Sequence, residues 1–495
     1  MDVFMRESDA FTWYMEGDPV LRSTVVIVAW LDKTPEWASL VAKVDRATRL
    51  IPQFRQRVLE PPARLAAPRW TTDGDFDLGW HLRRTEAPAP HTPQTVVEFA
   101  RREAMTAFDR SRPLWEATLI EHLDGDKAAL VMKLHHSLTD GIGAVQLALL
   151  LFDDERRPAG DGPMPSVPAG EEFDAVGLVR AGVAQRLQQV GEFVGGRARS
   201  ALPSALRAAR HPLSSSADVV RTAASIGRTV VPVLTTLSPV MQRRGLGRHL
   251  DHVDFSLDEF KRAAGAAGGS INDGFVAALA GGLRRYHERH DASVDRLRVT
   301  MPISLRTPQD PIGGNRITLM RLVVPVSQPD PALRIADIGR RCRAIKEERS
   351  LAFANTIAGA LNLLPSAAVG SMLKHVDFLA SDVPGFTAPV YLAGAKVERY
   401  VVFGPTIGAS VNVTMLSYCG RCYAGINVDT AAVPDPDVLV ECLREGFDEV
   451  LGLGGAHEPA ARLPGPPPVP AEGEAGGTQP RRPARRSPRN QRLAG

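Results

Sequence analysis

The stretch Leu134-His135-His136-Ser137-Leu138-Thr139-Asp140-Gly141 has apolar residues on both sides, and the rest of the chain is organised around it. Residues 128–134 have the pattern of a short apolar strand, and residues 144–152 that of an apolar helix. The two histidines are therefore predicted at the point where a strand passes into a loop. Open sheets usually carry their chemistry at such positions.

Histidine is the side chain whose unperturbed pKa lies near neutrality, so His135 or His136 can take a proton from an alcohol or thiol and return it. Gly141 has no side chain and would let a substrate approach the imidazole closely. Two adjacent histidines with Asp140 four residues on are also compatible with a metal-ligand pair or a structural cluster. The spacing alone leaves all three interpretations open.

The pattern His-His-x-x-x-Asp-Gly resembles the signature of the bacterial wax ester synthase/acyl-CoA:diacylglycerol acyltransferase family. That family belongs to the superfamily of CoA-dependent acyltransferases and peptide-synthetase condensation domains. Further stretches match it in the expected order, and the resemblance extends from Ser8 to about Leu453. These stretches are Pro113-Leu114-Trp115-Glu116, Asn272-Asp273, Pro302-Ile303-Ser304-Leu305-Arg306, Gly314-Asn315-Arg316 and Val383-Pro384-Gly385.

The resemblance implies an α/β fold of two chloramphenicol-acetyltransferase-like halves, each a mixed sheet with helices, with an active-site channel between them. A length of 495 residues independently favours more than one domain. We place the N-terminal half with the histidine motif at residues 1–155 and the C-terminal half at 246–455. Residues 156–245 are predicted to form a linker with a helical or lid segment, and 456–495 a disordered tail rich in Pro and Arg.

The resemblance also assigns roles within the motif. It implies that His136 rather than His135 is the general base, and that Asp140 fixes the loop instead of moving protons. No metal and no cofactor are expected beyond acyl-CoA as co-substrate.

Other matched residues are expected to support the site. Pro113, Trp115 and Glu116 are interpreted as scaffold beside it, since a Trp at the start of a strand is more often part of a core. The resemblance places Asn272 and Asp273 near the site, although both are also good residues for the first turn of a helix. The family has Val-like residues after this pair, whereas this chain has Gly274.

Asp140 needs a partner if it is buried. Arg306 and Arg316 are candidates, because a planar guanidinium can hold a carboxylate with two hydrogen bonds. Asn315 lies in the same polar turn as Arg316, and solvated surface arginines are the alternative.

Local patterns predict how the histidines are presented. Residues 115–122 and 128–134 read as strands, and Asp124-Gly125-Asp126 between them is a turn signal. The two strands should form a hairpin that delivers His135 and His136 to its end. Residues 80–82 have a strand-like pattern as well.

Composition excludes some classes of protein. The net charge is +3, and six arginines of the tail account for it, leaving 53 basic against 56 acidic residues. The folded part is therefore not expected to bind nucleic acid. Of the four cysteines, Cys419 and Cys422 form a lone C-x-x-C pair, which is weak support for a metal site.

No apolar run reaches the roughly 18 residues that a membrane-spanning helix needs, and the N-terminus has no signal-peptide pattern. We expect a cytoplasmic protein. Residues 173–209 form a basic amphipathic pattern that suits either packing on the protein itself, which we favour, or contact with a membrane or lipid droplet. Residues 219–241 contain Pro232 and Pro239, which suit a lid or a lipid contact.

The function expected from the resemblance is transfer of a long-chain acyl group from acyl-CoA to a lipid alcohol. We predict that diacylglycerol is preferred over fatty alcohols, giving triacylglycerol ahead of wax esters. The alternative is a lipid-binding or lipid-body-coating protein that keeps the scaffold without turnover. A condensation-type enzyme acting on amines is a weaker third hypothesis, because no carrier-protein domain accompanies the chain.

Overall fold

The computed structural model describes residues 4–61, 67–138, 141–158, 160, 162–168, 235–304, 317–346, 370 and 373–462. Four of the predicted site residues lie outside these ranges, namely Asp140, Arg306, Asn315 and Arg316. Most of the predicted lid segment and almost all of the predicted tail lie outside them too. None of the helices in the described ranges combines the length and apolarity that a membrane-spanning helix requires.

A six-stranded sheet with the order β11-β12-β1-β6-β5-β4 takes four strands from the N-terminal half of the chain, whereas β11 and β12 come from residues 391–403 of the C-terminal half. β1 (Thr24–Leu31), rich in β-branched residues, lies antiparallel between β6 (Lys127–His135) and β12 (Ala395–Phe403). β5 (Trp115–Leu123) pairs antiparallel with β6 and parallel with β4 (Leu82–Glu86). The edge strand β11 is Tyr391–Leu392, and β2 (Gln56–Leu59) and β3 (Arg69–Thr72) form a separate pair.

The C-terminal half contains a seven-stranded sheet with the order β15-β7-β14-β13-β10-β8-β9. β10 runs parallel to both β13 and β8, while the other neighbours are antiparallel. Both halves therefore have mixed sheets, as predicted. The strands are β7 Arg248–Ser256, β8 Arg296–Ser304, β9 Ile317–Pro325, β10 Phe378–Phe386, β13 Val411–Tyr418, β14 Arg421–Asp429 and β15 Ala461–Arg462.

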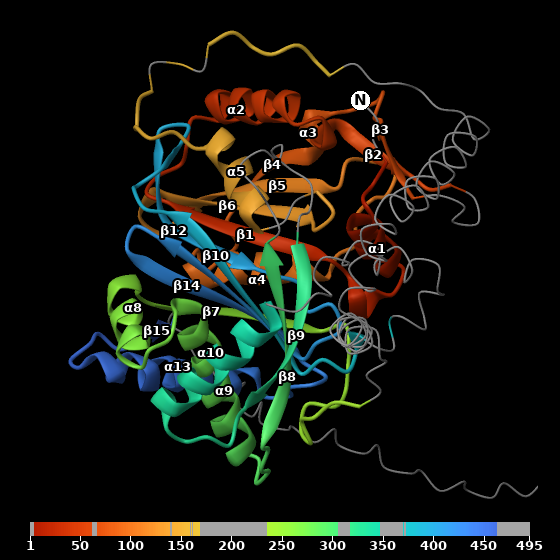
Figure 1. Cartoon of the computed structure of the whole chain (residues 1–495). Coiled ribbons are helices and arrows are strands. Elements are labelled where there is room, and N and C mark those ends of the chain that lie inside the picture. The colour runs from red at the N-terminus through yellow and green to blue at the C-terminus, as the bar shows by residue number, and fades with distance from the viewer. Residues whose placement is uncertain are drawn as a thin grey trace, which may run out of the picture. The chain divides into compact units, whose positions relative to one another are not determined.

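Helices cover both sheets (Figure 1). α2 and α5 lie on one face of the six-stranded sheet, and α8, α9, α10 and α13 lie beside the seven-stranded sheet. α4 contacts β1, β6 and β7. The helices are α1 Glu7–Met15, α2 Trp37–Leu50, α3 Leu78–His81, α4 Pro93–Met105, α5 Gly141–Leu151, α8 Leu257–Ala266, α9 Ile271–Glu288, α10 Pro331–Lys346 and α13 Pro436–Leu451.

The predicted hairpin is confirmed. β5 and β6 pair from Trp115 opposite Leu134 to Leu123 opposite Lys127, and residues 124–126 form the turn. Gly125 has φ +73° there, a conformation that glycine adopts without strain. The prediction for residues 80–82 was partly wrong, because Leu78–His81 is a helical turn and β4 begins only at Leu82. The Asp77 carboxylate accepts a hydrogen bond from the Gly79 N–H at 2.8 Å and so caps that turn.

His252 of β7 lies in the interior between Trp30 of β1 and Tyr423 of β14, at ring-centroid distances of 6.0 and 6.4 Å. Its exposed fraction is 0%, and neither ring nitrogen has a hydrogen-bond partner among the described residues. Burial lowers the pKa of His252 to about 4, because the imidazolium form would have to give up its hydration.

We expect the protein to lose stability as the pH falls from about 6.5 to about 4. In the unfolded chain His252 binds a proton below its ordinary pKa of 6.5, whereas in the folded chain it does so only below about 4. The unfolded state therefore binds more protons across this window, and the difference amounts to about 3 kcal/mol over the whole of it. Urea unfolding of wild type and His252→Leu at a series of pH values measures this contribution.

The His252→Leu variant should show a shallower dependence of unfolding free energy on pH. His457→Leu, which changes a partly exposed histidine after α13, is the control and should keep the wild-type slope. If the unfolding free energies of wild type and His252→Leu depended on pH in the same way, His252 would not be the source of the loss of stability.

Candidate active site

The hairpin presents the two histidines beside the beginning of β1. The backbone N–H of His135 donates to the Leu114 carbonyl at 3.0 Å, and that of His136 donates to the Ser23 carbonyl at 2.9 Å. The loop is thus fixed on both sides, by the residue before β5 and by the residue before β1. Its position follows from backbone bonds that most residue types could make.

His135 is completely buried, with an exposed fraction of 0%. The Ser137 N–H donates to its Nδ1 at 3.1 Å, so Nδ1 is the acceptor and the ring proton of the neutral form lies on Nε2. Nε2 lies 3.3 Å from a carboxylate oxygen of Glu16, just beyond the end of α1. The rings of Trp13 and Phe108 meet the imidazole edge-on at 6.0 and 5.9 Å. His135 is consequently held in one orientation from every side.

Glu16 is a site residue that the sequence did not indicate. Burial alone would raise the pKa of its carboxyl, but the contact with the His135 imidazole, the N–H of Ser23 and the charge of Arg22 together hold the pKa below its ordinary value. The same oxygen that faces His135 accepts the Ser23 N–H at 2.9 Å. A charged Glu16 therefore connects His135 to the strand start that holds His136.

His136 differs from its neighbour because its side chain is only half-buried. A substrate can reach a half-buried imidazole, whereas one that is fully enclosed by protein can only orient its surroundings. This contrast in exposure is what distinguishes the two histidines within the described residues.

Gly141, the last residue of the motif, lies against β10 of the C-terminal half. A Cβ placed on Gly141 would lie 2.7 Å from a methyl carbon of Val383, so any larger residue would push the two apart. Val383 begins the matched Val383-Pro384-Gly385 stretch. Two motifs, whose residues Gly141 and Val383 are 242 positions apart in the sequence, therefore meet at the beginning of α5.

Trp115 and its neighbours form a packed scaffold. The Trp115 indole N–H donates to the Phe54 carbonyl at 2.8 Å, and its ring stacks on His81 at 4.7 Å. Pro113 is buried, and its carbonyl accepts the Trp115 N–H at 2.9 Å. Glu116 contacts Arg83 and the buried Lys133, whose ammonium lies 3.3 Å away. These are the contacts of a packed scaffold, and that the three residues support the site stays a prediction.

Asn272 and Asp273 lie in the first turn of α9. The Asp273 carboxylate accepts the Ser270 N–H at 2.9 Å and the Ser270 hydroxyl at 2.7 Å, while the Asp273 N–H donates back to that hydroxyl. In this reciprocal capping box Ser270 is the N-cap and Asp273 the third helical residue, and that Asn272 and Asp273 support the site stays a prediction. Close packing of α9 on α8 explains the glycine at position 274, because a Cβ there would lie 2.9 Å from the Cβ of Ala264 in α8.

An apolar cavity lies between the six-stranded sheet and helices α2 and α5, with about 600 Å³ of empty space when its opening to solvent is included. Leu134 of β6 and Ala144 of α5 line it, and these two residues flank the loop that carries His136. The small residues Ala47, Ala117 and Ala148 keep it open. Its remaining lining residues are Ile27, Val44, Thr48, Ile51, Phe54, Trp115, Leu130, Met132, Leu147, Leu151, Phe152 and Tyr400.

Among the described residues, one group of side chains has the spacing of a metal site, formed by His249, Asp251 and Asp437. Arg462 pairs with both of its carboxylates, so their charge is already compensated. Cys419 is exposed in the turn between β13 and β14, whereas Cys422 is buried in β14, and both are free thiols.

Solved structures define the class of fold. The wax ester synthase/diacylglycerol acyltransferase from Marinobacter aquaeolei VT8 is similar with a TM-score of 0.62 at 21% identity, covering 91% of this chain and 98% of that one. The first condensation domain of the calcium-dependent antibiotic synthetase gives 0.60 at 16% identity, covering 93% and 98%. The fold is therefore the two-half fold shared by such acyltransferases and condensation domains, as expected.

The sequence then identifies the family. Residues 5–275 match the wax ester synthase/diacylglycerol acyltransferase catalytic domain, and residues 313–450 match the C-terminal domain of the same family. Two Mycobacterium tuberculosis proteins named "putative diacylglycerol O-acyltransferase" are 34% and 31% identical to this chain. The first match covers 90% of this chain and 91% of that protein, and the second covers 81% and 88%. The chain belongs to the wax ester synthase/diacylglycerol acyltransferase family.

Proposed function

We propose that the protein transfers a long-chain acyl group from acyl-CoA to a lipid alcohol, with diacylglycerol preferred over fatty alcohols. The observation that carries this proposal is the apolar cavity between the sheet and helices α2 and α5. His136 is not itself a lining residue, but β6 and α5, the two elements that its loop connects, both contribute to the walls. An alkyl chain gains about 0.8 kcal/mol for each methylene that it buries there.

In this mechanism His136 accepts the proton of the acceptor hydroxyl. The hydroxyl oxygen attacks the thioester carbonyl carbon, and the carbon–sulfur bond then breaks. The imidazolium of His136 returns its proton to the departing thiolate, so the products are an ester and CoA. The steps need no metal and no cofactor besides the acyl-CoA substrate. His135, oriented by Glu16 and Ser137, would serve as a positioning residue.

Narrowing the cavity should change the preferred acyl chain. Ala148 is buried on α5 and lines the cavity, so Ala148→Phe would place a ring where chain carbons are expected. Displacing two methylenes costs about 1.6 kcal/mol, which exceeds a tenfold loss in kcat/KM. We expect that loss with palmitoyl-CoA and less than a threefold change with butyryl-CoA, measured as CoA thiol release with a fixed acceptor.

Leu149→Phe is the matched control. Leu149 follows on the same helix but is 55% exposed, so its enlargement should leave both substrates unaffected. Equal losses with palmitoyl-CoA and butyryl-CoA in Ala148→Phe would show that the cavity does not hold the acyl chain.

A further inference from the structure

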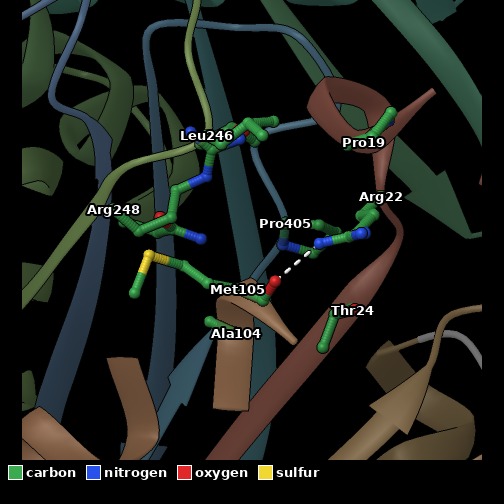
Figure 2. A pocket seen from close by; sticks show the side chains of 10 residues that line it. Pro19, Arg22, Thr24, Ala104, Met105, Leu246, Arg248 and Pro405 are labelled. Atoms are coloured by element: carbon green, nitrogen blue, oxygen red, sulfur yellow. Dashed lines mark hydrogen bonds between the residues drawn. The ribbon is translucent and has the colours of Figure 1, made fainter. Parts of the chain in front are cut away.

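A second, polar pocket lies where the two halves meet, with about 320 Å³ of empty space when its opening to solvent is included (Figure 2). Four parts of the described chain supply its walls: the beginning of β1, the end of α4, the beginning of β7 with the end of β14, and the loop after β12. The lining residues are Pro19, Arg22, Thr24, Ala104, Met105, Leu246, Arg248, Pro405, Thr406 and Asn427.

The charged residues in this lining are both arginines. Figure 2 shows Arg22 and Arg248 on opposite sides of the pocket, with Met105 between them. Arg22 donates one guanidinium N–H to the Met105 carbonyl at 2.5 Å, and among the described residues no carboxylate lies within 4 Å of it. The planar guanidinium has five N–H donors, so most of them remain available.

Arg248 is 92% buried, and neighbouring backbone carbonyls and one carboxylate hold its guanidinium group in place. It donates to the carbonyls of Gly245 and Gly247, and its Nη1 lies 3.4 Å from a carboxylate oxygen of Asp429. Burial lowers the pKa of Arg248, Asp429 opposes that effect, and the nearby charge of Arg22 lowers the pKa further. Because both arginines line the same pocket, an anion bound between them would offset their like charges.

The lining also contains polar atoms that lack partners. The Thr24 hydroxyl is buried, and the Thr24 residue is 3% exposed, yet the hydroxyl makes no hydrogen bond among the described residues. The carbonyl oxygen of the Asn427 side chain is likewise without a partner, while its amide donates to the Gly404 carbonyl at 2.9 Å. Buried polar atoms without partners are costly, so a ligand with an acceptor oxygen beside the Thr24 hydroxyl would satisfy that group.

The polar cavity and the apolar cavity lie on opposite sides of the loop that carries His135 and His136, here called the reacting loop. Thr24 pairs with His135 across β1 and β6, and the Ser23 carbonyl that holds His136 lies between Arg22 and Thr24. Successive residues of a strand point to opposite faces. Leu134 lines the apolar cavity, whereas its neighbour His135 faces Glu16, on the other side of the sheet.

We propose that the cavity between Arg22 and Arg248 binds the phosphate group of a substrate. Guanidinium groups bind phosphate oxygens with two hydrogen bonds each, and the Thr24 hydroxyl supplies a further donor. The phosphate can come from CoA, which rests on the proposed use of acyl-CoA, or from a phosphorylated lipid acceptor. In either case the substrate would lie across the reacting loop, with its anionic end opposite the apolar cavity.

Equilibrium binding to the full chain tests this without turnover. The probes are CoA without an acyl group, a short-chain lysophosphatidic acid and inorganic phosphate, titrated into wild type, Arg22→Gln, Arg248→Gln and Thr24→Val. We expect each arginine variant to bind at least one of the two organic phosphates about tenfold more weakly. Thr24→Val should lower the affinity for the same ligand by about threefold, and higher salt should reduce the affinity of the wild type.

Arg102→Gln is the control, because Arg102 lies on the same helix α4 with 70% of its side chain exposed. A loss confined to CoA assigns the cavity to the acyl donor, and one confined to lysophosphatidic acid assigns it to the acceptor. If the wild type binds CoA and the three pocket variants bind every probe as tightly as the wild type does, the phosphate site is refuted while the proposed acyl transfer stands. If wild type binds none of the probes, the phosphate site is refuted as well. Should Arg248→Gln fail to fold, Arg22→Gln and Thr24→Val decide the outcome.

Discussion

Replacing His136 by alanine is expected to lower kcat about a thousandfold and to change the unfolding free energy by less than about 1 kcal/mol. A positioned general base contributes about a hundredfold to ten-thousandfold, and the half-buried side chain of His136 leaves little packing to lose. The measurements are CoA thiol release with diacylglycerol present and urea unfolding of the same preparations.

His135→Ala provides the comparison. This variant would remove a completely buried ring and leave the low-pKa carboxylate of Glu16 without its partner, so it should lose several kcal/mol of stability. The expected pattern is a stable, inactive His136 variant beside a destabilised His135 variant. Near-normal turnover by His136→Ala would refute its role as the base.

Gly385→Ala is expected to destabilise the protein by about 3 kcal/mol or more. A Cβ at this position would lie 1.9 Å from the Ser417 carbonyl oxygen and 2.8 Å from a methyl carbon of Leu416, so β10 and β13 would have to separate. The register of these two strands already shifts between Val383 and Phe386. Because Val383 contacts Gly141, the same change should also disturb the reacting loop.

Gly265→Ala is the control for this variant. Gly265 lies in α8, and among the described residues no atom outside its chain neighbours and the backbone of its own helix would be within 4 Å of an added Cβ. Alanine favours helices over glycine by up to about 1 kcal/mol, so this substitution should stabilise the protein slightly. Urea unfolding of both variants gives the two differences. A Gly385→Ala protein as stable as Gly265→Ala would show that β10 and β13 are not packed as closely as described.

The parts of the fold that depend on local signals could be predicted from the sequence. The hairpin that carries His135 and His136 follows from two alternating segments and one Asp-Gly turn, and the capping box of α9 from Ser270 and Asp273. Non-local pairing could not be predicted in this way. Nothing in residues 395–403 indicates that β12 will pair with β1, because the partner strand is more than 360 residues away.

The site shows the same division. The motif identified His136 by resemblance, but Glu16 lies beyond a short helix with no sequence pattern that connects it to His135, and only the folded chain brings them within 3.3 Å. One weak feature of the sequence points to the apolar cavity: the small residues Ala144 and Ala148 are four positions apart and so lie on the same face of α5. Arg22 and Arg248 come from separate halves, so their common pocket is a product of tertiary structure.

The most direct test of the proposed function is the release of CoA from palmitoyl-CoA by the purified full chain, with and without diacylglycerol, with analysis of the lipid product. The proposed function predicts little release without the acceptor and, with it, one triacylglycerol formed for each CoA released. Offering hexadecanol at the same concentration should yield less wax ester than triacylglycerol. Binding of palmitoyl-CoA without acceptor-dependent release would contradict acyl transfer and would favour a lipid-coating protein on the same scaffold.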